Sequence, residues 1–275
     1  MSTDESYTYH DVVLDIQGQI GVIKLNRPRA LNSFGGNMQI EVLTALRVLD
    51  EHPTTVFTVL TGEGRFFSSG ADVKAEASRE ERVFGSAAEK KVFYMSMFAS
   101  AMETLRSLIT HTKILVVALN GPAVGGGAAW FPAVADITVA SETSYLQVPF
   151  SQLGLVPEYG CAVHFRQLIG PHRANDFLMF GRKISNQEMV DWGIVSTILP
   201  VKGFDKAVLA FLKDKLDVND GRSMIEAKRL QNEPLRAERL LAVYEAADAL
   251  AERFVINAPR DRFLQQSAKL RGKTG

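Results

Sequence analysis

The sequence has little of several features, and each shortage excludes a class of protein. Its 275 residues include one cysteine, Cys161, so no disulfide forms within the chain and the fold does not require an oxidising compartment. Neither sign of charge is in excess, because 31 lysines and arginines balance 31 aspartates and glutamates. Nucleic-acid binders and polybasic membrane-surface proteins need an excess of basic residues. The composition therefore predicts no nucleic-acid partner.

Long apolar runs are also missing. The run from Ile114 to Leu119 ends at Asn120-Gly121, far short of the roughly 18 residues of a membrane span, so we expect no such span. Residues 1–6 are acidic and lack arginine, unlike a signal peptide or a mitochondrial presequence. The sequence ends Lys273-Thr274-Gly275, whereas a peroxisomal Ser-Lys-Leu address occupies the last three positions. From the sequence alone we expect no readable address.

Three familiar catalytic or cofactor patterns are absent as well. The five histidines lie far apart and Cys161 has no cysteine at ligand spacing, so no metal site is predicted. No Gly-x-Ser-x-Gly pentapeptide supplies a hydrolase serine. The glycine run at 125–127 is not Gly-x-Gly-x-x-Gly and does not follow the first strand. A dinucleotide cofactor is therefore not expected.

What is present is an alternation of strand and helix patterns over about the first 200 residues. Residues 12–25 predict a hairpin, and residues 38–49 predict a helix with Ile40, Leu43, Leu46 and Leu49 on one face. Further strands are expected at 55–60, 114–119 and 137–140, and further helices at 93–109 and 128–134. Such alternation indicates a parallel sheet with crossover connections. The charged stretch 76–82 is expected to be solvated or mobile.

Beyond Pro200 the strand patterns stop. Residues 206–216 and 224–254 predict amphipathic helices, the second kinked or divided by Pro234. We therefore expect a mixed α/β core over residues 1–200 and a helical C-terminal region over residues 201–275.

Two glycine-containing turns, at 66–73 and 120–127, each follow an apolar strand. Backbone N–H groups at such turns point outward, which suits an anion or a developing oxyanion, and glycine lets a ligand approach closely. One such turn usually serves packing alone. Two turns at equivalent places favour a binding site.

A third segment, residues 153–160, places Glu158 among apolar residues and glycines. Burial there should raise its pKa, which suits a general base that must also return its proton. Alternatively, Pro157 starts a helix and Glu158 is an acid of its first turn. Several apolar residues either line a pocket or belong to the core, which is the commoner role: Met95, Phe98, Met102, Trp130 and Tyr159.

Together these segments resemble the crotonase (enoyl-CoA hydratase/isomerase) superfamily. The resemblance spans nearly the whole chain and rests on Leu25-Asn26-Arg27-Pro28, Phe67-Ser68-Ser69-Gly70-Ala71-Asp72, Asn120-Gly121-Pro122-Ala123, Leu153-Gly154-Leu155-Val156-Pro157 and Trp192-Gly193-Ile194-Val195. It implies an α/β spiral of ββα units with a C-terminal helical region that forms homotrimers, often paired into hexamers. The implied substrate is an acyl-CoA thioester, with no separate cofactor.

Position by position, the resemblance implies roles for particular residues. The backbone N–H groups of Ala71 and Gly126 form an oxyanion hole for the thioester enolate, in agreement with the turns described above. The CoA and substrate pocket is formed by Arg29, Ala30, Leu31, Ser68, Gly70, Asp72 and Val73. Within this set Asp72 mainly holds its loop, and Arg29 either meets a CoA phosphate or remains a solvated surface arginine.

Acidic residues discriminate among members of this family. Hydratases carry two glutamates at the positions of Ala129 and Phe150, and dienoyl-CoA isomerases keep an acid at the second of these beside Glu158. One glutamate after Leu-Gly-Leu is the pattern of Δ3,Δ2-enoyl-CoA isomerases, most similar here to the fungal peroxisomal branch. We therefore expect Glu158 to convert 3-enoyl-CoA into trans-2-enoyl-CoA by a 1,3-proton transfer, a step in β-oxidation of unsaturated fatty acids.

Two other classes of function stay open. In the first, the chain is another crotonase-type enzyme, a hydratase or a thioester hydrolase, and Glu158 activates water. In the second, the chain binds acyl-CoA without converting it. The resemblance implies a peroxisomal location, while the unreadable address leaves cytoplasmic and mitochondrial locations as alternatives.

Overall fold

A seven-stranded sheet forms the centre of the computed structural model, which describes residues 4–72 and 82–262. In spatial order its strands are β1 (Glu5–Thr8), β2 (Val12–Gln17), β3 (Ile20–Leu25), β4 (Phe57–Gly62), β5 (Ile114–Leu119), β7 (Ile137–Ser141) and β10 (Thr197–Leu199). The first three strands pair antiparallel and the others parallel. The predicted hairpin and the parallel crossovers are thus confirmed, whereas β1 was not predicted.

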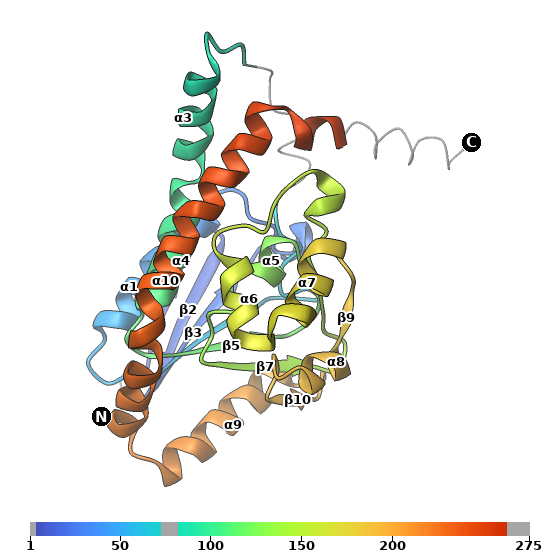
Figure 1. Ribbon diagram of the computed structural model, residues 1–275. Helices are drawn as coiled ribbons and strands as arrows, with labels where there is room; N and C mark the ends of the chain where they lie inside the picture. The colour runs from blue at the N-terminus through green and yellow to red at the C-terminus, as the bar shows by residue number, and fades with distance from the viewer. Residues whose placement is uncertain (1–3, 73–81, 263–275) are drawn as a thin grey trace.

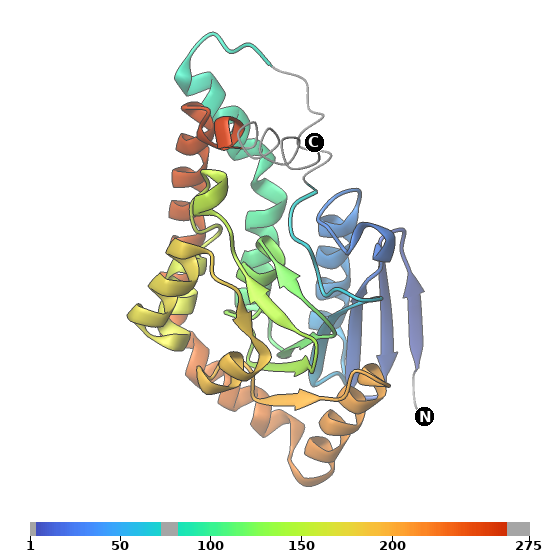
Figure 2. The same ribbon diagram turned by 90° about the vertical axis from the view of Figure 1, so that its right-hand side faces the viewer.

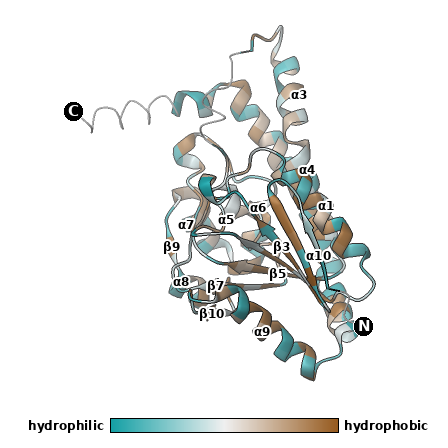
Figure 3. Ribbon diagram, turned by 180° about the vertical axis from the view of Figure 1, so that it is seen from behind, coloured by the Kyte–Doolittle hydropathy of each residue, from teal (hydrophilic) through white to brown (hydrophobic). Residues whose placement is uncertain are grey.

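The sheet is covered on both faces, as Figures 1 and 2 show. One face packs against α1 (Met38–Glu51) and α4 (Ala99–Thr110), and the other against α9 (Phe204–Val218). Figure 3 shows apolar residues along the strands, while the outer helices alternate between apolar and polar residues. The functional segments lie where the parallel strands β4 and β5 end.

The predicted face of α1 is wrong in one respect. Ile40 is 59% exposed, whereas Leu46 and Leu49 are buried, together with Met38 and Val42. At 3.6 residues per turn, nine residues place Ile40 about half a turn away from Leu49, so strict three-residue steps drift off the buried face.

The helix predicted at 93–109 is two helices, α3 (Ala87–Met97) and α4. Between them, the Phe98 N–H donates to the carbonyls of both Tyr94 and Met95, a tightening typical of a helix end. The helix predicted at 128–134 is shorter, because α5 covers Gly126–Ala129. The stretch 76–82, expected to be solvated or mobile, lies outside the described residues except for Arg82.

A small second sheet, not predicted, carries the chain away from the glycine turn at 120–127. It consists of β6 (Ala123–Val124), β8 (Tyr145–Gln147) and β9 (Ile184–Ser185). The short helices η2 (Ser151–Leu153), α6 (Cys161–Ile169), α7 (Pro171–Phe180) and α8 (Asn186–Asp191) complete this part, while η1 (Pro28–Ala30) lies between β3 and α1. Because β6 directly follows the turn after β5, the turn at 120–122 joins the two sheets.

After β10 the described chain is helical, as the sequence indicates. Helix α10 (Gly221–Val255) is continuous through Pro234, so the predicted division at that residue is wrong. It runs along the side of the molecule, past α4 to α3, and also contacts α6 (Figure 1). Leu230, whose carbonyl Pro234 leaves without a helical N–H partner, is 64% exposed, so water can satisfy that carbonyl.

No helix in the described ranges is long and apolar enough to cross a membrane.

Candidate active site

The two glycine turns lie side by side, although 55 positions separate Phe67 from Pro122. The Phe67 N–H donates to the Pro122 carbonyl over 3.0 Å, and the Val124 N–H donates to the Ser68 carbonyl over 2.9 Å. These bonds form an isolated parallel bridge between Ser68 and Ala123, beyond the ends of β4 and β5. The turns therefore form one rigid unit at the sheet edge.

Gly70 is a point of close approach between the turns. Its φ is +81°, and a Cβ there would lie 2.6 Å from the Val124 carbonyl oxygen and 3.1 Å from the Gly126 nitrogen. Any side chain would push the loop away from the second turn. Glycine at this position therefore sets how near Ala71 and Gly126 lie to each other.

The amides of Ala71 and Gly126 are available to a ligand. Gly126 is the first residue of α5, whose N–H has no partner within the helix. In residues 4–72 and 82–262, neither amide donates a hydrogen bond to a protein acceptor. Two free backbone donors on neighbouring loops are what a developing oxyanion requires.

Buried polar bonds hold the first of these loops. The Ser68 hydroxyl, fully buried, donates to the Asn32 carbonyl over 2.8 Å and accepts the Gly70 N–H over 3.1 Å. Beyond Gly70, the Asp72 carboxylate lies 3.6 Å from the Arg27 guanidinium, and Arg27 also donates to the Ser33 carbonyl. Asp72 is thus tied to the scaffold by charge. Val73, a predicted substrate-binding residue, lies outside the described residues.

The segment predicted to bind CoA borders the same loop. The Ser69 N–H donates to the Leu31 carbonyl over 2.9 Å, and the Phe34 N–H donates to the Gly70 carbonyl over 2.8 Å. Arg29, in η1, is exposed to solvent, so its guanidinium is accessible to an anion. The structure therefore brings Arg29, Ala30 and Leu31 to the loop that carries Ala71.

Glu158 stands before α6 and not in its first turn, because that helix begins at Cys161 after a left-handed Gly160. Burial raises the pKa of the Glu158 carboxyl to about 7, against the opposing effect of a hydrogen bond from the Trp130 indole. The Trp130 Nε1 lies 3.3 Å from the Glu158 Oε2. Near neutral pH this carboxyl can therefore both accept and return a proton.

An aromatic cluster around Trp130 lies beside this carboxyl. Trp130 stacks on Phe34 with ring centroids 4.5 Å apart, and Tyr159 meets it edge-on at 5.1 Å. Tyr159 in turn contacts Phe98 at 6.1 Å. This environment explains the raised pKa, because it offers the ionised form little solvation.

Acids expected of a hydratase are missing from this region. Ala129 and Phe150 are buried, apolar side chains with 0% and 2% exposure. No group of three side chains able to hold a metal ion occurs in the described part of the chain. The site therefore offers one proton-transfer group and two amide donors.

Sequence reasoning treated Trp130 as a core or pocket residue and did not find its bond to Glu158. Phe34, its stacking partner, was not singled out at all. Both residues form the wall beside Gly126, since a Cβ on that glycine would lie 2.8 Å from the Phe34 ring and 2.9 Å from the Trp130 ring. The only available signal was a tryptophan next to the helix that follows the glycine run.

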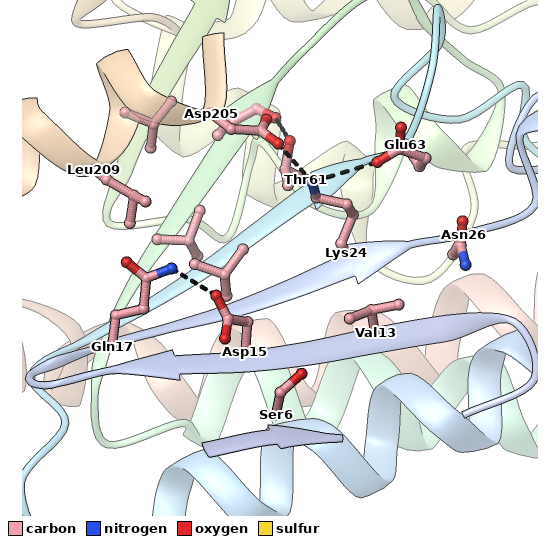
Figure 4. Close-up of a pocket in the computed structure, with 14 residues that line it drawn as sticks. Ser6, Val13, Asp15, Gln17, Lys24, Asn26, Thr61, Glu63, Asp205 and Leu209 are labelled. Atoms are coloured by element: carbon pink, nitrogen blue, oxygen red, sulfur yellow. Dashed lines mark hydrogen bonds and ion pairs between the residues drawn. The ribbon is translucent and has the colours of Figure 1, made fainter. Parts of the chain in front are cut away.

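A separate cavity of about 450 Å³ lies on the α9 face of the sheet, away from Glu158. Figure 4 shows Lys24 at its centre, paired with Glu63 and Asp205, and Gln17 bonded to Asp15. Lys24, the one cation among the described residues of its lining, is thus already paired with two of its three carboxylates. The site at Glu158 instead places two backbone amides and a carboxyl bonded to Trp130 on neighbouring segments, and it is the candidate active site.

Comparison with known proteins agrees with this architecture. Residues 15–257 match the Enoyl-CoA hydratase/isomerase family. A Delta(3,5)-Delta(2,4)-dienoyl-CoA isomerase of Pyricularia oryzae is 31% identical, over 92% of this chain and 94% of its own. A 3,2-trans-enoyl-CoA isomerase of Saccharomyces cerevisiae is also 31% identical, over 73% and 74%. A crystal structure of an enoyl-CoA hydratase/isomerase from Mycobacterium paratuberculosis superposes with a TM-score of 0.78 at 25% identity, over 94% and 99%.

Proposed function

The chain belongs to the enoyl-CoA hydratase/isomerase family, and from that premise we propose that it is a Δ3,Δ2-enoyl-CoA isomerase. The observation that carries the proposal is the single enclosed carboxyl, Glu158, beside two free amides and without a second acid at Ala129 or Phe150. Hydration needs one group to activate water and one to deliver a proton. Moving a double bond by one position needs a single group, because no atom is gained or lost.

The mechanism follows from these parts. The Glu158 carboxylate takes a proton from C2 of 3-enoyl-CoA, and the C–H electron pair passes into the dienolate. The amides of Ala71 and Gly126 hold the negative thioester oxygen. The Glu158 carboxyl then returns the proton to C4, the C2–C3 double bond forms and the thioester carbonyl is restored. The apolar surroundings keep water from competing for the dienolate.

A second candidate is a dienoyl-CoA isomerase, favoured by the likeness of nearly the whole chain to the Pyricularia oryzae enzyme. That reaction moves two double bonds and carries a proton further along the substrate. Phe150 supplies no acid for that longer transfer. We therefore rank this activity below the Δ3,Δ2 isomerisation.

The experiment is turnover of trans-3-hexenoyl-CoA by the purified chain, followed as 2-enoyl-CoA formation. Wild type should turn over, and Glu158→Gln should lose at least about 10² in rate, because it removes the general base. Glu245→Gln, an exposed glutamate on α10, is the matched control and should keep wild-type activity.

The products separate the alternatives. Release of 3-hydroxyacyl-CoA or free CoA would indicate that Glu158 activates water and that the chain is a hydratase or a thioester hydrolase. Binding without conversion would make it an acyl-CoA-binding protein. Conversion of 3,5-dienoyl-CoA in preference to 3-hexenoyl-CoA would favour the second candidate.

Three further features belong to the proposal and follow from the family resemblance. The chain requires no separate cofactor, since CoA is part of the substrate. It assembles as a homotrimer or a pair of trimers through its helical C-terminal region, which light scattering measures. It works in the peroxisome, with the cytoplasm and mitochondrion as alternatives that imaging of a tagged chain distinguishes.

A further inference from the structure

We propose that Trp130 is the positioning residue of Glu158: its indole N–H holds Oε2 and leaves Oε1 as the oxygen that carries the proton. This inference rests on the proposed function, because the proton is the one moved between C2 and C4. It assigns a role in the reaction to a residue that carries no acid–base chemistry of its own.

Trp130 contacts the Glu158 carboxyl directly. The Trp130 Nε1 lies 3.3 Å from the Glu158 Oε2, and no other side chain of the described residues bonds to that carboxyl. An indole N–H is a donor only, so it neither takes nor gives up the reacting proton. It can hold Oε2 while the carboxyl is ionised and also when Oε1 carries the proton. The same bond thus persists through both halves of the reaction.

The Trp130 side chain is itself fixed in position. It is 5% exposed, its backbone N–H donates to the Gly126 carbonyl over 2.9 Å, and its ring lies flat on Phe34. Tyr159 also contacts the ring edge-on, with ring centroids 5.1 Å apart. A side chain held from three directions can fix the rotamer of the carboxyl that it contacts.

Trp130 contacts both parts of the site, the turn that carries Gly126 and the Glu158 carboxyl. Its ring lies where a Cβ of Gly126 would fall, at 2.9 Å, while its nitrogen contacts Glu158. The base is therefore placed relative to the same glycine whose amide holds the thioester oxygen. Correct placement of reacting groups is worth large factors in rate, and a small displacement loses much of it.

The chemical consequence is a defined path for the proton. The C2–H bond breaks and the O–H bond forms at Oε1; this O–H bond then breaks as the C4–H bond forms. Because Oε2 is held, the carboxyl does not need to rotate between the two transfers. One oxygen takes the proton from C2 and gives it to C4 on the same face of the substrate.

The first test compares the two tryptophans of the chain. Trp130→Phe keeps an aromatic ring but removes the N–H, and Trp192→Phe is the matched control, since Trp192 lies under Arg173 and Arg182 away from the site. We expect Trp130→Phe to lower kcat about tenfold with KM little changed, because the apolar wall remains. The pH at which activity is lost on the acid side of the pH profile should also be higher for Trp130→Phe than for Trp192→Phe. A common acid limb and equal kcat values would overturn the proposal.

The second test needs no turnover, so it separates this inference from the proposed function. Trp192→Phe leaves Trp130 as the only tryptophan, and its fluorescence should change with pH near 7 as Glu158 ionises. Adding Glu158→Gln should abolish that change. A titration that is flat, or that survives Glu158→Gln, would overturn the contact in solution. A clear titration in a chain that does not isomerise 3-hexenoyl-CoA would instead reject the proposed function while supporting the contact.

Discussion

At the scale of single residues, the site depends on a place where a side chain is missing. Gly70 combines a positive φ with contact to the second turn, so two different costs meet at one position. The conformational cost applies to any non-glycine residue with φ above zero. The steric clash of an added Cβ would increase the distance between the amides of Ala71 and Gly126.

The two costs can be separated by substitution. Gly70→Ala should lose turnover by about 10², because the added Cβ displaces one of two oxyanion donors. Gly193→Ala is the control: its φ is +76°, and a Cβ there has nothing within 4 Å. It should lose about 1 kcal/mol of unfolding free energy, from the left-handed backbone, and keep its activity. Urea unfolding and kcat measure both, and similar kcat values in the two variants would contradict the argument.

Sequence reasoning reached some of these residues and missed others for a physical reason. Glu158 and the glycine turns could be identified because each stands inside a local pattern of apolar residues and glycines. The role of Trp130 could not, because its partners are brought together by the fold: Phe34 and Glu158 lie far away on either side in the sequence. The functions assigned to Arg29, Ala30 and Leu31 stay predictions.

At the scale of elements, a largely buried charge pair links α10 to the residue that precedes β7. Lys228 Nζ lies 2.8 Å from an Asp136 oxygen, with 9% and 13% of the two side chains exposed. Asp136 also accepts the Leu115 N–H and the Asn232 amide, each over 2.7 Å. Burial lowers the pKa of Lys228 although Asp136 opposes the shift, so solvent contributes little to the pair.

Removing the lysine charge should therefore be costly. Lys228→Met leaves the buried Asp136 carboxylate without its cation and should lower the unfolding free energy by about 3 kcal/mol. Lys91→Met is the matched control on α3, where Lys91 pairs with Asp248 and Glu252 of the same α10 at the surface. That change should alter stability little, because water screens exposed pairs. Chemical denaturation compares them, and equal losses would refute the distinction.

The elements themselves were largely predictable. Strand and helix periods identify β2, β3, β5, α1 and both C-terminal helices, and family membership agrees with the predicted α/β spiral. The small sheet was not predictable, because its strands have two or three residues and no visible period. The domain boundary at residue 200 and the role of the C-terminal region in trimer formation stay predictions.

At the scale of the whole molecule, buried titratable groups act on stability in opposite directions. Burial lowers the pKa values of His111 and His164 to about 4 and raises that of Glu158 to about 7. As pH falls from 6.5 toward 4, the unfolded chain binds protons that the folded histidines do not, so stability is lost. As pH falls from 7 toward 4.5, folded Glu158 binds a proton that the unfolded chain does not, so stability is gained.

The two effects can be separated with the variant already proposed for catalysis. Between about pH 4.5 and 6.5, stability of Glu158→Gln should fall with decreasing pH more steeply than that of wild type, by about 1.4 kcal/mol per pH unit. At pH 8 the variant should be the more stable protein, because wild type keeps a charge in an apolar site. Urea unfolding across this range gives both slopes, and parallel curves would show that Glu158 titrates normally.

The pairing of the two glycine turns has a consequence for any attempt to move this site elsewhere. The turns carry the amides, but Asn32, Arg27 and the backbone of β4 and β5 fix the spacing between them. A graft of the turns alone would transfer the glycines and lose that spacing. The smallest portable piece runs from Arg27 to Glu158, and with it come β4, β5 and β7 of the central sheet.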